Sequence, residues 1–214
     1  SDLFYGQLNP SDIDPLNFIN QDNDLASVII NLIDNDFITN ESGDQAKIQF
    51  SLNSKPIEDA SVTIPISLFE NEDEIELPIN EIIIENQNWD KSELNQIILT
   101  GLDDFILDGD QSINFITGDP KSTDINYNNL NASSIANLVI QNQDNDFAGL
   151  VLSGDVKPVG TIPEGSSISS YELTKSTSES GATVTFKVKL TVQPSSHVTF
   201  YSTLADISEV GVIE

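Results

Sequence analysis

An internal repeat is the feature that most constrains the fold of this chain. Residues 1–30 align with residues 123–152 without a gap, at an offset of 123 − 1 = 122. The alignment pairs Asp2 with Asp124 and Tyr5 with Tyr127, and it carries the pentapeptide NQDND at 20–24 onto its second copy at 142–146. A chance match of five residues would not extend over thirty. The sequence therefore predicts a tandem array of similar units.

A second alignment sets the boundaries of these units. Residues 38–56 match residues 176–194 at an offset of 138, so the later copy has 138 − 122 = 16 more residues between its first two strands. The extra residues fall in 153–176, a stretch rich in Gly, Ser and Pro that we interpret as a loop. We expect residues 1–24 to be the C-terminal strands of a preceding repeat, 25–146 a complete repeat, and 147–214 the beginning of a following repeat with a longer loop. The absence of Met suggests a fragment whose targeting signal lies elsewhere.

The complete unit has the sequence pattern of short β-strands. Seven stretches alternate apolar and polar residues, or are β-branched runs bounded by Gly, Pro, Asn and Asp: 26–32, 46–52, 60–68, 81–85, 95–101, 112–118 and 135–141. Helical periodicity does not extend far enough to compete. The pattern predicts an all-β chain, with an immunoglobulin-like seven-strand antiparallel β-sandwich in tandem repeats.

Charge is distributed unevenly between the two ends of that sandwich. The chain has 35 Asp and Glu against eight Lys and Arg, a formal net charge of -27. Alternating strand directions place six acids and three Lys at one pole of the complete unit. They place fifteen acids and no Lys at the other: Asp34, Asp36, Glu41, Asp44, Glu70, Glu72, Asp73, Glu74, Glu76, Asp103, Asp104, Asp108, Asp110, Asp144 and Asp146. Such a surface disfavours nucleic acid and anionic lipid as partners.

Cations are the partners that this charge favours. Two carboxylates about 4 Å apart repel by roughly 1 kcal/mol in water and roughly 4 kcal/mol at an effective dielectric constant of 20. Ca²⁺ fits best because it takes six to eight oxygen ligands in irregular geometry, whereas Zn²⁺ prefers Cys and His and the chain has no Cys and one His, His197. For any single acidic loop, a plain solvated turn is the simpler interpretation. The convergence of four segments favours a calcium site.

Several stretches of this unit resemble the Calx-beta family, in particular its bacterial tandem repeats. They are ESG at 41–43, SLNSKPIEDASVTIPISL at 51–68, NW at 88–89, LTGLDDFILDGDQSINFITG at 99–118, STDINYNNLN at 122–131 and NQDND at 142–146. The resemblance implies a seven-strand sandwich that binds Ca²⁺ where its last strand ends. The ligands that it implies are Glu41, Asp73, Asp103, Asp104, Asp108, Asp110, Asp144 and Asp146, with Asp22 and Asp24 closing the site of the preceding unit.

These patterns favour a calcium-binding structural repeat of a large extracellular or cell-surface protein, such as an adhesin or filament, with ions stiffening the junctions. The expected partners are calcium ions and neighbouring repeats, with other copies or a cell-surface ligand as further candidates. We expect no nucleic acid and, because no run of about 18 apolar residues occurs, no membrane insertion in this segment. We also expect no catalysis, since His197 beside Ser195 and Ser196 falls in a predicted turn. An ancillary module of a secreted enzyme and a calcium-sensing regulatory module are the alternatives.

Overall fold

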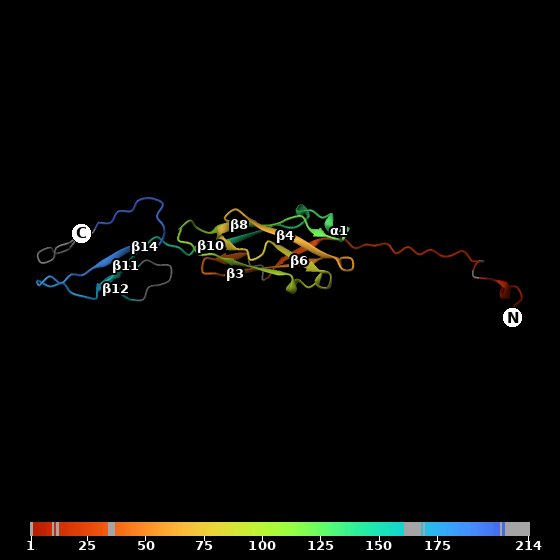
Figure 1. Ribbon diagram of the computed structural model, residues 1–214, viewed down its shortest axis with the longest axis horizontal. Helices are drawn as coiled ribbons and strands as arrows, with labels where there is room; N and C mark the ends of the chain where they lie inside the picture. Colours follow the sequence, from red (N-terminus) through yellow and green to blue (C-terminus); the bar gives the residue numbers. More distant parts are fainter. Residues whose placement is uncertain are drawn as a thin grey trace.

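The computed structural model describes residues 2–9, 11, 13–33, 37–160, 168, 170–201 and 203. These residues form an all-β structure with several antiparallel sheets and few helical turns. Residues 25–146, here called the central body, hold two sheets. Figure 1 shows an N-terminal segment leading away from one end of the central body and a C-terminal segment, from residue 147 onward, at the opposite end.

The first sheet of the central body has four antiparallel strands in the order β1-β3-β7-β5. They are β1 (Val28–Leu32), β3 (Gln45–Leu52), β7 (Gln96–Gly101) and the short β5 (Ile75–Glu76). In β3 every second side chain is buried, which is the pattern expected of a strand with one face on the core.

The second sheet has its strands in the order β2-β10-β8-β4-β6, and β9 also pairs with β4. Its members are β2 (Ile38–Asn40), β10 (Leu138–Gln143), β8 (Gln111–Thr117), β4 (Ser61–Phe69), β6 (Glu81–Glu85) and β9 (Lys121–Ser122). All pairs are antiparallel except β2 with β10, which is parallel. Each of the seven stretches predicted as strands overlaps one: β1, β3, β4, β6, β7, β8 and β10.

A continuous apolar core joins these two sheets in a sandwich-like arrangement. It takes Ile48 and Phe50 from the first sheet and Ile64, Ile113 and Phe115 from the second, all at 0% exposure. The rings of Phe50 and Phe115 meet with their centroids 6.3 Å apart and tilted by 49°. Burial of each such side chain contributes about 1.5–3 kcal/mol, so packing between the sheets is the main source of stability.

The helical elements of the described residues are single turns, and all except η1 lie between strands. They are α1 (Ile125–Asn128) and the 3-10 turns η1 (Tyr5–Gln7), η4 (Glu72–Glu74), η5 (Asn86–Asn88), η6 (Ser92–Leu94) and η7 (Ala132–Ser134). Asp124 caps α1 by accepting a hydrogen bond from the backbone N of Asn126, and its other oxygen accepts from the backbone N of Ile57. Among the described residues, no helix has the length and apolar character needed to cross a membrane.

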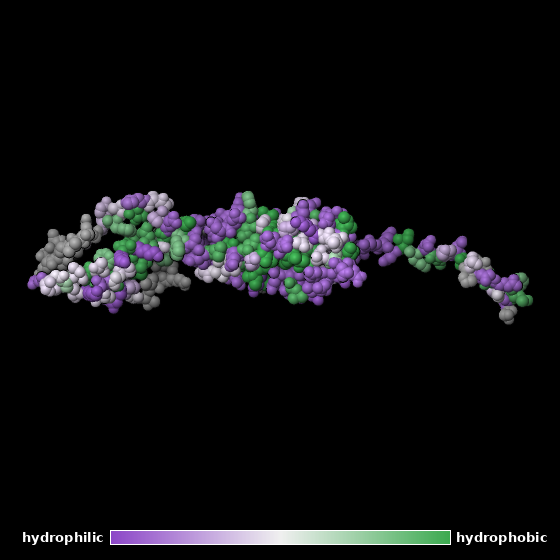
Figure 2. Space-filling model, viewed as in Figure 1, coloured by the Kyte–Doolittle hydropathy of each residue, from purple (hydrophilic) through white to green (hydrophobic). Residues whose placement is uncertain are grey.

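The C-terminal segment contains two small sheets. β11 (Leu150–Gly154) pairs with β14 (Phe186–Leu190), and β12 (Val156–Pro158) pairs with β13 (Tyr171–Leu173), both antiparallel. The prediction of a plain loop over 153–176 is therefore wrong for the residues in β12 and β13, which form strands. Figure 2 shows apolar and hydrophilic side chains interspersed over the central body and the C-terminal segment.

The pairing of β11 with β14 repeats the pairing of β1 with β3. Each strand pair covers five residues in the same register once the offsets of 122 and 138 from the sequence are applied. The equivalent end pairs are Val28 with Leu52 and Leu150 with Leu190, then Leu32 with Ile48 and Gly154 with Phe186. A backbone hydrogen bond just beyond each pair is equivalent too, from Asn53 to Ser27 and from Thr191 to Gly149. The pair of β11 with β14 thus has the same local structure as the pair of β1 with β3, although the two strands of the pair have different sequence offsets.

The described residues of the N-terminal segment carry exposed apolar side chains, among them Phe4, Phe18 and Ile19. Figure 1 shows this segment extended beyond the central body. Within its NQDND copy, the backbone N of Asp24 donates to the carboxylate of Asp22 at 3.0 Å. The second copy makes the same local bond.

Candidate metal centre

A parallel strand pair brings Glu41 beside Asp144. β2 lies next to β10 with Asn40 paired to Gln143, so both strands end at the same edge of the sheet. The backbone N of Glu41 continues the ladder by donating to the carbonyl of Gln143 at 3.2 Å. Because the chain leaves β2 and β10 in the same direction, the acids that follow these two strands lie together.

The structure gathers three of the predicted ligands into a carboxylate triad of Glu41, Asp144 and Asp146. One carboxylate oxygen from each lies within 4.8 Å of the others. Two backbone bonds fix the arrangement, from Asn145 N to Glu41 Oε2 at 2.8 Å and from Asp146 N to Asp144 Oδ1 at 2.7 Å. Ligands about 2.3–2.6 Å from one Ca²⁺ are at most about 4.6–5.2 Å apart, so the spacing of the triad suits a single ion.

One buried oxygen of the triad lacks a hydrogen-bond partner within the part of the chain that the structure describes. Oδ2 of Asp146 is buried and accepts no hydrogen bond from a described residue. A buried acceptor that stays unsatisfied costs about 1–3 kcal/mol, and more when it is charged. A cation at this position would satisfy it, so the residues present fit a bound metal ion.

Burial and mutual repulsion raise the pKa values of these acids. Burial is the main reason that the pKa of Glu41, which is 5% exposed, lies above its ordinary value, and the charges of Asp144, Asp146 and Asp104 raise it further. The backbone N–H of Asn145 offsets part of this effect. Burial also raises the pKa of Asp146, followed by the charge of Asp144. The triad is therefore electrostatically unfavourable when ionised and without a counter-ion.

Glu74 is a fourth inward-facing acid that the sequence did not single out. It is 9% exposed, and its carboxylate accepts a hydrogen bond from Nδ2 of Asn142 at 3.0 Å. Burial raises its pKa, the Asn142 bond lowers it, and the charges of Asp108, Asp104 and Asp73 raise it again. The sequence offered Asp73 for this loop, whereas the structure leaves Asp73 exposed and turns Glu74 inward. The available signal was the position of Glu74 directly before β5.

Asn142, the first residue of the second NQDND copy, supports this site through the hydrogen bonds of its buried side chain. Its side chain donates to Glu74 and to the carbonyl of Leu102 at 3.2 Å, and it accepts from Oγ1 of Thr39 at 2.9 Å. It is 1% exposed. A Cβ on the neighbouring Gly101 would lie 2.4 Å from Oδ1 of Asn142, so only glycine fits there. Sequence reasoning did not identify Asn142 or Gly101 as parts of the site.

Residues 102–110, here called the junction loop, carry the four predicted Asp ligands that follow β7. The loop is bonded to the triad at its far end, where Gly109 N donates to Asp144 Oδ2 at 2.7 Å and Asp144 N donates to Asp110 Oδ1 at 3.2 Å. The charge of Asp104 raises the pKa of Glu41, Glu74 and Asp146. We call Glu41, Glu74, Asp104, Asp144 and Asp146 the carboxylate cluster.

The remaining predicted ligands lie around the cluster or away from it. Asp103 and Asp108 are exposed, and their charges raise the pKa of Asp146. Asp22 and Asp24 are exposed on the N-terminal segment and are not part of the triad. Asp34 and Asp36, which were counted at the acidic pole, lie outside the described residues.

Ion pairing within the described residues does not neutralise this cluster. Both ion pairs lie in the C-terminal segment, Lys157 with Glu172 and Lys175 with Asp155. A different lysine, Lys189, comes near the junction loop, with its Nζ 5.9 Å from the ring centroid of Phe105. That contact crosses from the C-terminal segment to the central body.

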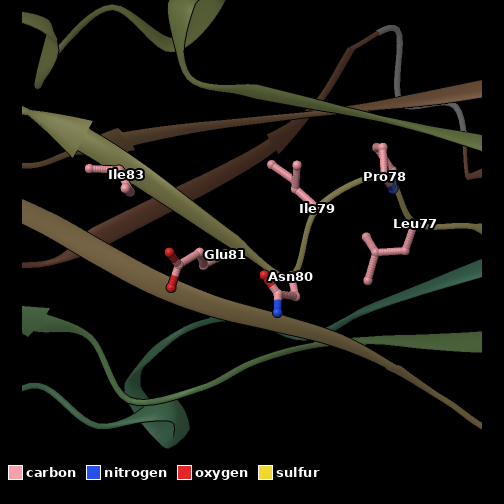
Figure 3. Close-up of a pocket in the computed structure, with 6 residues that line it drawn as sticks. All are labelled: Leu77, Pro78, Ile79, Asn80, Glu81 and Ile83. Atoms are coloured by element: carbon pink, nitrogen blue, oxygen red, sulfur yellow. The ribbon is translucent and has the colours of Figure 1, made fainter.

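A surface depression lies away from this site, along the start of β6 (Figure 3). It has a volume of about 570 Å³ and is lined by Leu77, Pro78, Ile79, Asn80, Glu81 and Ile83. Glu81 is the one titratable residue in this lining. The depression therefore lacks the converging charged groups that the triad has.

Comparisons with known proteins leave the geometry of the site as the main guide to function. No protein-family model matches this sequence, and no curated protein matches it.

Proposed function

We propose that this chain is part of a calcium-binding structural array in which each unit is an immunoglobulin-like seven-strand β-sandwich. The observation that carries the proposal is the carboxylate triad with its unpartnered, buried Asp146 Oδ2. Bound Ca²⁺ supplies positive charge that offsets the repulsion among these acids. An ion that binds only the folded chain also raises its stability.

The chemistry of the donors favours Ca²⁺ over other common ions. Glu41, Asp144 and Asp146 would hold it, and the charge of Asp104 acts on both Glu41 and Asp146. The five acids of the carboxylate cluster offer oxygens from loops that follow four different strands, which suits an ion that tolerates irregular coordination. Mg²⁺ prefers octahedral order and usually keeps several waters.

The tandem arrangement is supported by the repeated register of β1 with β3 and β11 with β14. It is also supported by the shared Asx-type bond in the two NQDND copies, from Asp24 N to Asp22 and from Asp146 N to Asp144. In the sequence, Asp144 and Asp146 lie between β10 and β11. An ion held there would sit at a junction between units and stiffen it.

A structural array of this kind belongs outside the cell or on its surface, as an adhesin or filament whose partners are its own neighbouring repeats. Extracellular modules bind Ca²⁺ with dissociation constants of roughly 10⁻⁴–10⁻³ M. A chain with net charge -27 stays soluble and repels anionic surfaces, so the ion rather than a lipid or nucleic acid is the expected ligand.

Thermal unfolding in CaCl₂, MgCl₂ or EDTA tests this proposal. We expect Ca²⁺ at 10 times its dissociation constant to stabilise the chain by about 1.4 kcal/mol and Mg²⁺ to do so less. Glu41→Gln should lose most of this response, whereas the exposed Glu93→Gln should keep it. Equal melting temperatures of the unsubstituted chain in Ca²⁺ and EDTA would refute the proposal.

A further inference from the structure

Phe105 of the junction loop touches the C-terminal segment. The backbone N of Gln193 donates to the carbonyl of Phe105 at 2.6 Å, and Nζ of Lys189 lies 5.9 Å from the centre of its ring. Lys189 is on β14, paired with Val151 of β11. Phe105 thus contacts both a charged side chain and the backbone of the C-terminal segment.

The same loop is bonded to the carboxylate triad beyond Phe105, where Gly109 N donates to Asp144 Oδ2 at 2.7 Å. Within the loop, Ile106 N donates to Asp104 Oδ1 at 2.6 Å, and this bond closes a turn around Phe105. A change in the position of Asp104 or Asp144 is therefore passed to Phe105 through a few backbone bonds.

These contacts to the C-terminal segment are individually weak. An exposed cation–π contact and a single backbone hydrogen bond each add only a small stabilisation. Phe105 remains 62% exposed, so little apolar burial adds to them. A contact of this strength holds only while the loop that presents it is held in place.

We propose that the junction loop is a latch in which Phe105 docks on the Lys189 face of the C-terminal segment, and that an ion in the carboxylate cluster holds the latch closed. The docking stands on the contacts themselves, while its dependence on an ion rests on the proposed function. The partner is the next segment of the same chain. Its positive Lys189 complements both the face of the aromatic ring and the acidic pole.

Spin-label distance measurements on the full chain test the latch. The chain has no Cys, so the exposed pair Ser67→Cys and Ser176→Cys gives one label on β4 and one on the C-terminal segment. We expect a narrow distance distribution in Ca²⁺ and a broad one in EDTA. The distance distribution of Phe105→Ala should be broad in both Ca²⁺ and EDTA. Leu107→Ala changes another exposed apolar residue of the same loop, and its distance distributions should match those of the unsubstituted chain.

Calorimetric Ca²⁺ titration of the same samples separates the two proposals. Phe105→Ala should bind Ca²⁺ within about threefold of the unsubstituted affinity, because its side chain contributes no ligand oxygen. A Phe105→Ala distribution as narrow as that of the unsubstituted chain in Ca²⁺ overturns the latch. The latch is also overturned if the distance distribution of the unsubstituted chain does not change with Ca²⁺ although the titration shows binding. Absence of binding heat in the unsubstituted chain, with no Ca²⁺-dependent stabilisation, instead counts against the proposed function.

Discussion

Replacing Asp146 with Asn removes one negative charge from the carboxylate triad and keeps the shape of the side chain. Its effect on stability should change sign with calcium. Without metal the substitution relieves repulsion, since Asp146 has carboxylate oxygens of Glu41 and Asp144 within 4.8 Å. With metal it removes a charged ligand, and the buried Oδ2 that had no partner becomes an amide group.

The magnitudes follow from the spacing. Two unit charges 4.8 Å apart repel by about 0.9 kcal/mol in water and about 3.5 kcal/mol at a dielectric constant of 20. Two such pairs give roughly 2–7 kcal/mol, and the low end is favoured because Asp144 and Asp146 are partly exposed, so that solvent screens their charges. We expect Asp146→Asn to stabilise the chain by about 2 kcal/mol in EDTA. A hundredfold loss of Ca²⁺ affinity would cost about 2.7 kcal/mol at saturating ion.

Urea unfolding of the two chains at pH 7, in EDTA and in CaCl₂, measures both effects. The exposed Asp90→Asn is a matched control and should change neither value by more than about 0.5 kcal/mol. If Asp146→Asn destabilises the chain by the same amount in EDTA and in Ca²⁺, the carboxylate is stabilised by something other than a cation, and the electrostatic reasoning is wrong.

Three further outcomes are expected. The pKa values of Glu41, Glu74 and Asp146 are raised above the ordinary 4.5 for Glu and 3.8 for Asp, so between the ordinary and the raised values the folded chain binds more protons than the unfolded chain. Stability in EDTA should therefore increase as pH falls from 7 through the raised values. In Ca²⁺ it should decrease, because protons compete with the ion. Urea titrations across pH 4.5–7 distinguish these slopes, and parallel slopes would contradict the shared site. Asn142→Ala should cost about 3 kcal/mol, because it leaves Glu74 and Thr39 without their partner; the exposed Asn145→Ala should cost less than 1 kcal/mol by the same assay. Gly101→Ala should cost about 2–3 kcal/mol, since its Cβ would lie 2.2 Å from the carbonyl oxygen of Asn40; a change below about 0.5 kcal/mol would show that β7 can move away.

The strands were predictable because the signal is local. Alternation in 46–52 is the burial pattern of β3, and the β-branched run at 81–85 is β6. What the pattern did not predict is the short β2 and its parallel pairing with β10. Three residues carry too little periodicity to be recognised, and the partner lies about 100 positions away in the chain.

The site was predictable as a region more than as a set of side chains. Strand direction indicated that the ends of four segments share one pole, and the triad combines residues from two of them, Glu41 with Asp144 and Asp146. The choice between Asp73 and Glu74 depended on which side chain the turn η4 directs inward, and a run of acids gives no sign of that. The contact of Lys189 with Phe105 could not be predicted from the sequence either, because it joins the C-terminal segment to the central body and no local pattern encodes their relative placement.

The most direct test of the central claim is a crystal structure of this chain grown in CaCl₂, with anomalous diffraction used to locate the ion. We expect a calcium peak bonded at about 2.3–2.6 Å to carboxylate oxygens of Glu41, Asp144 and Asp146. Water at that position together with calcium bound only elsewhere, or no bound calcium at a concentration of 10 mM, would contradict the account.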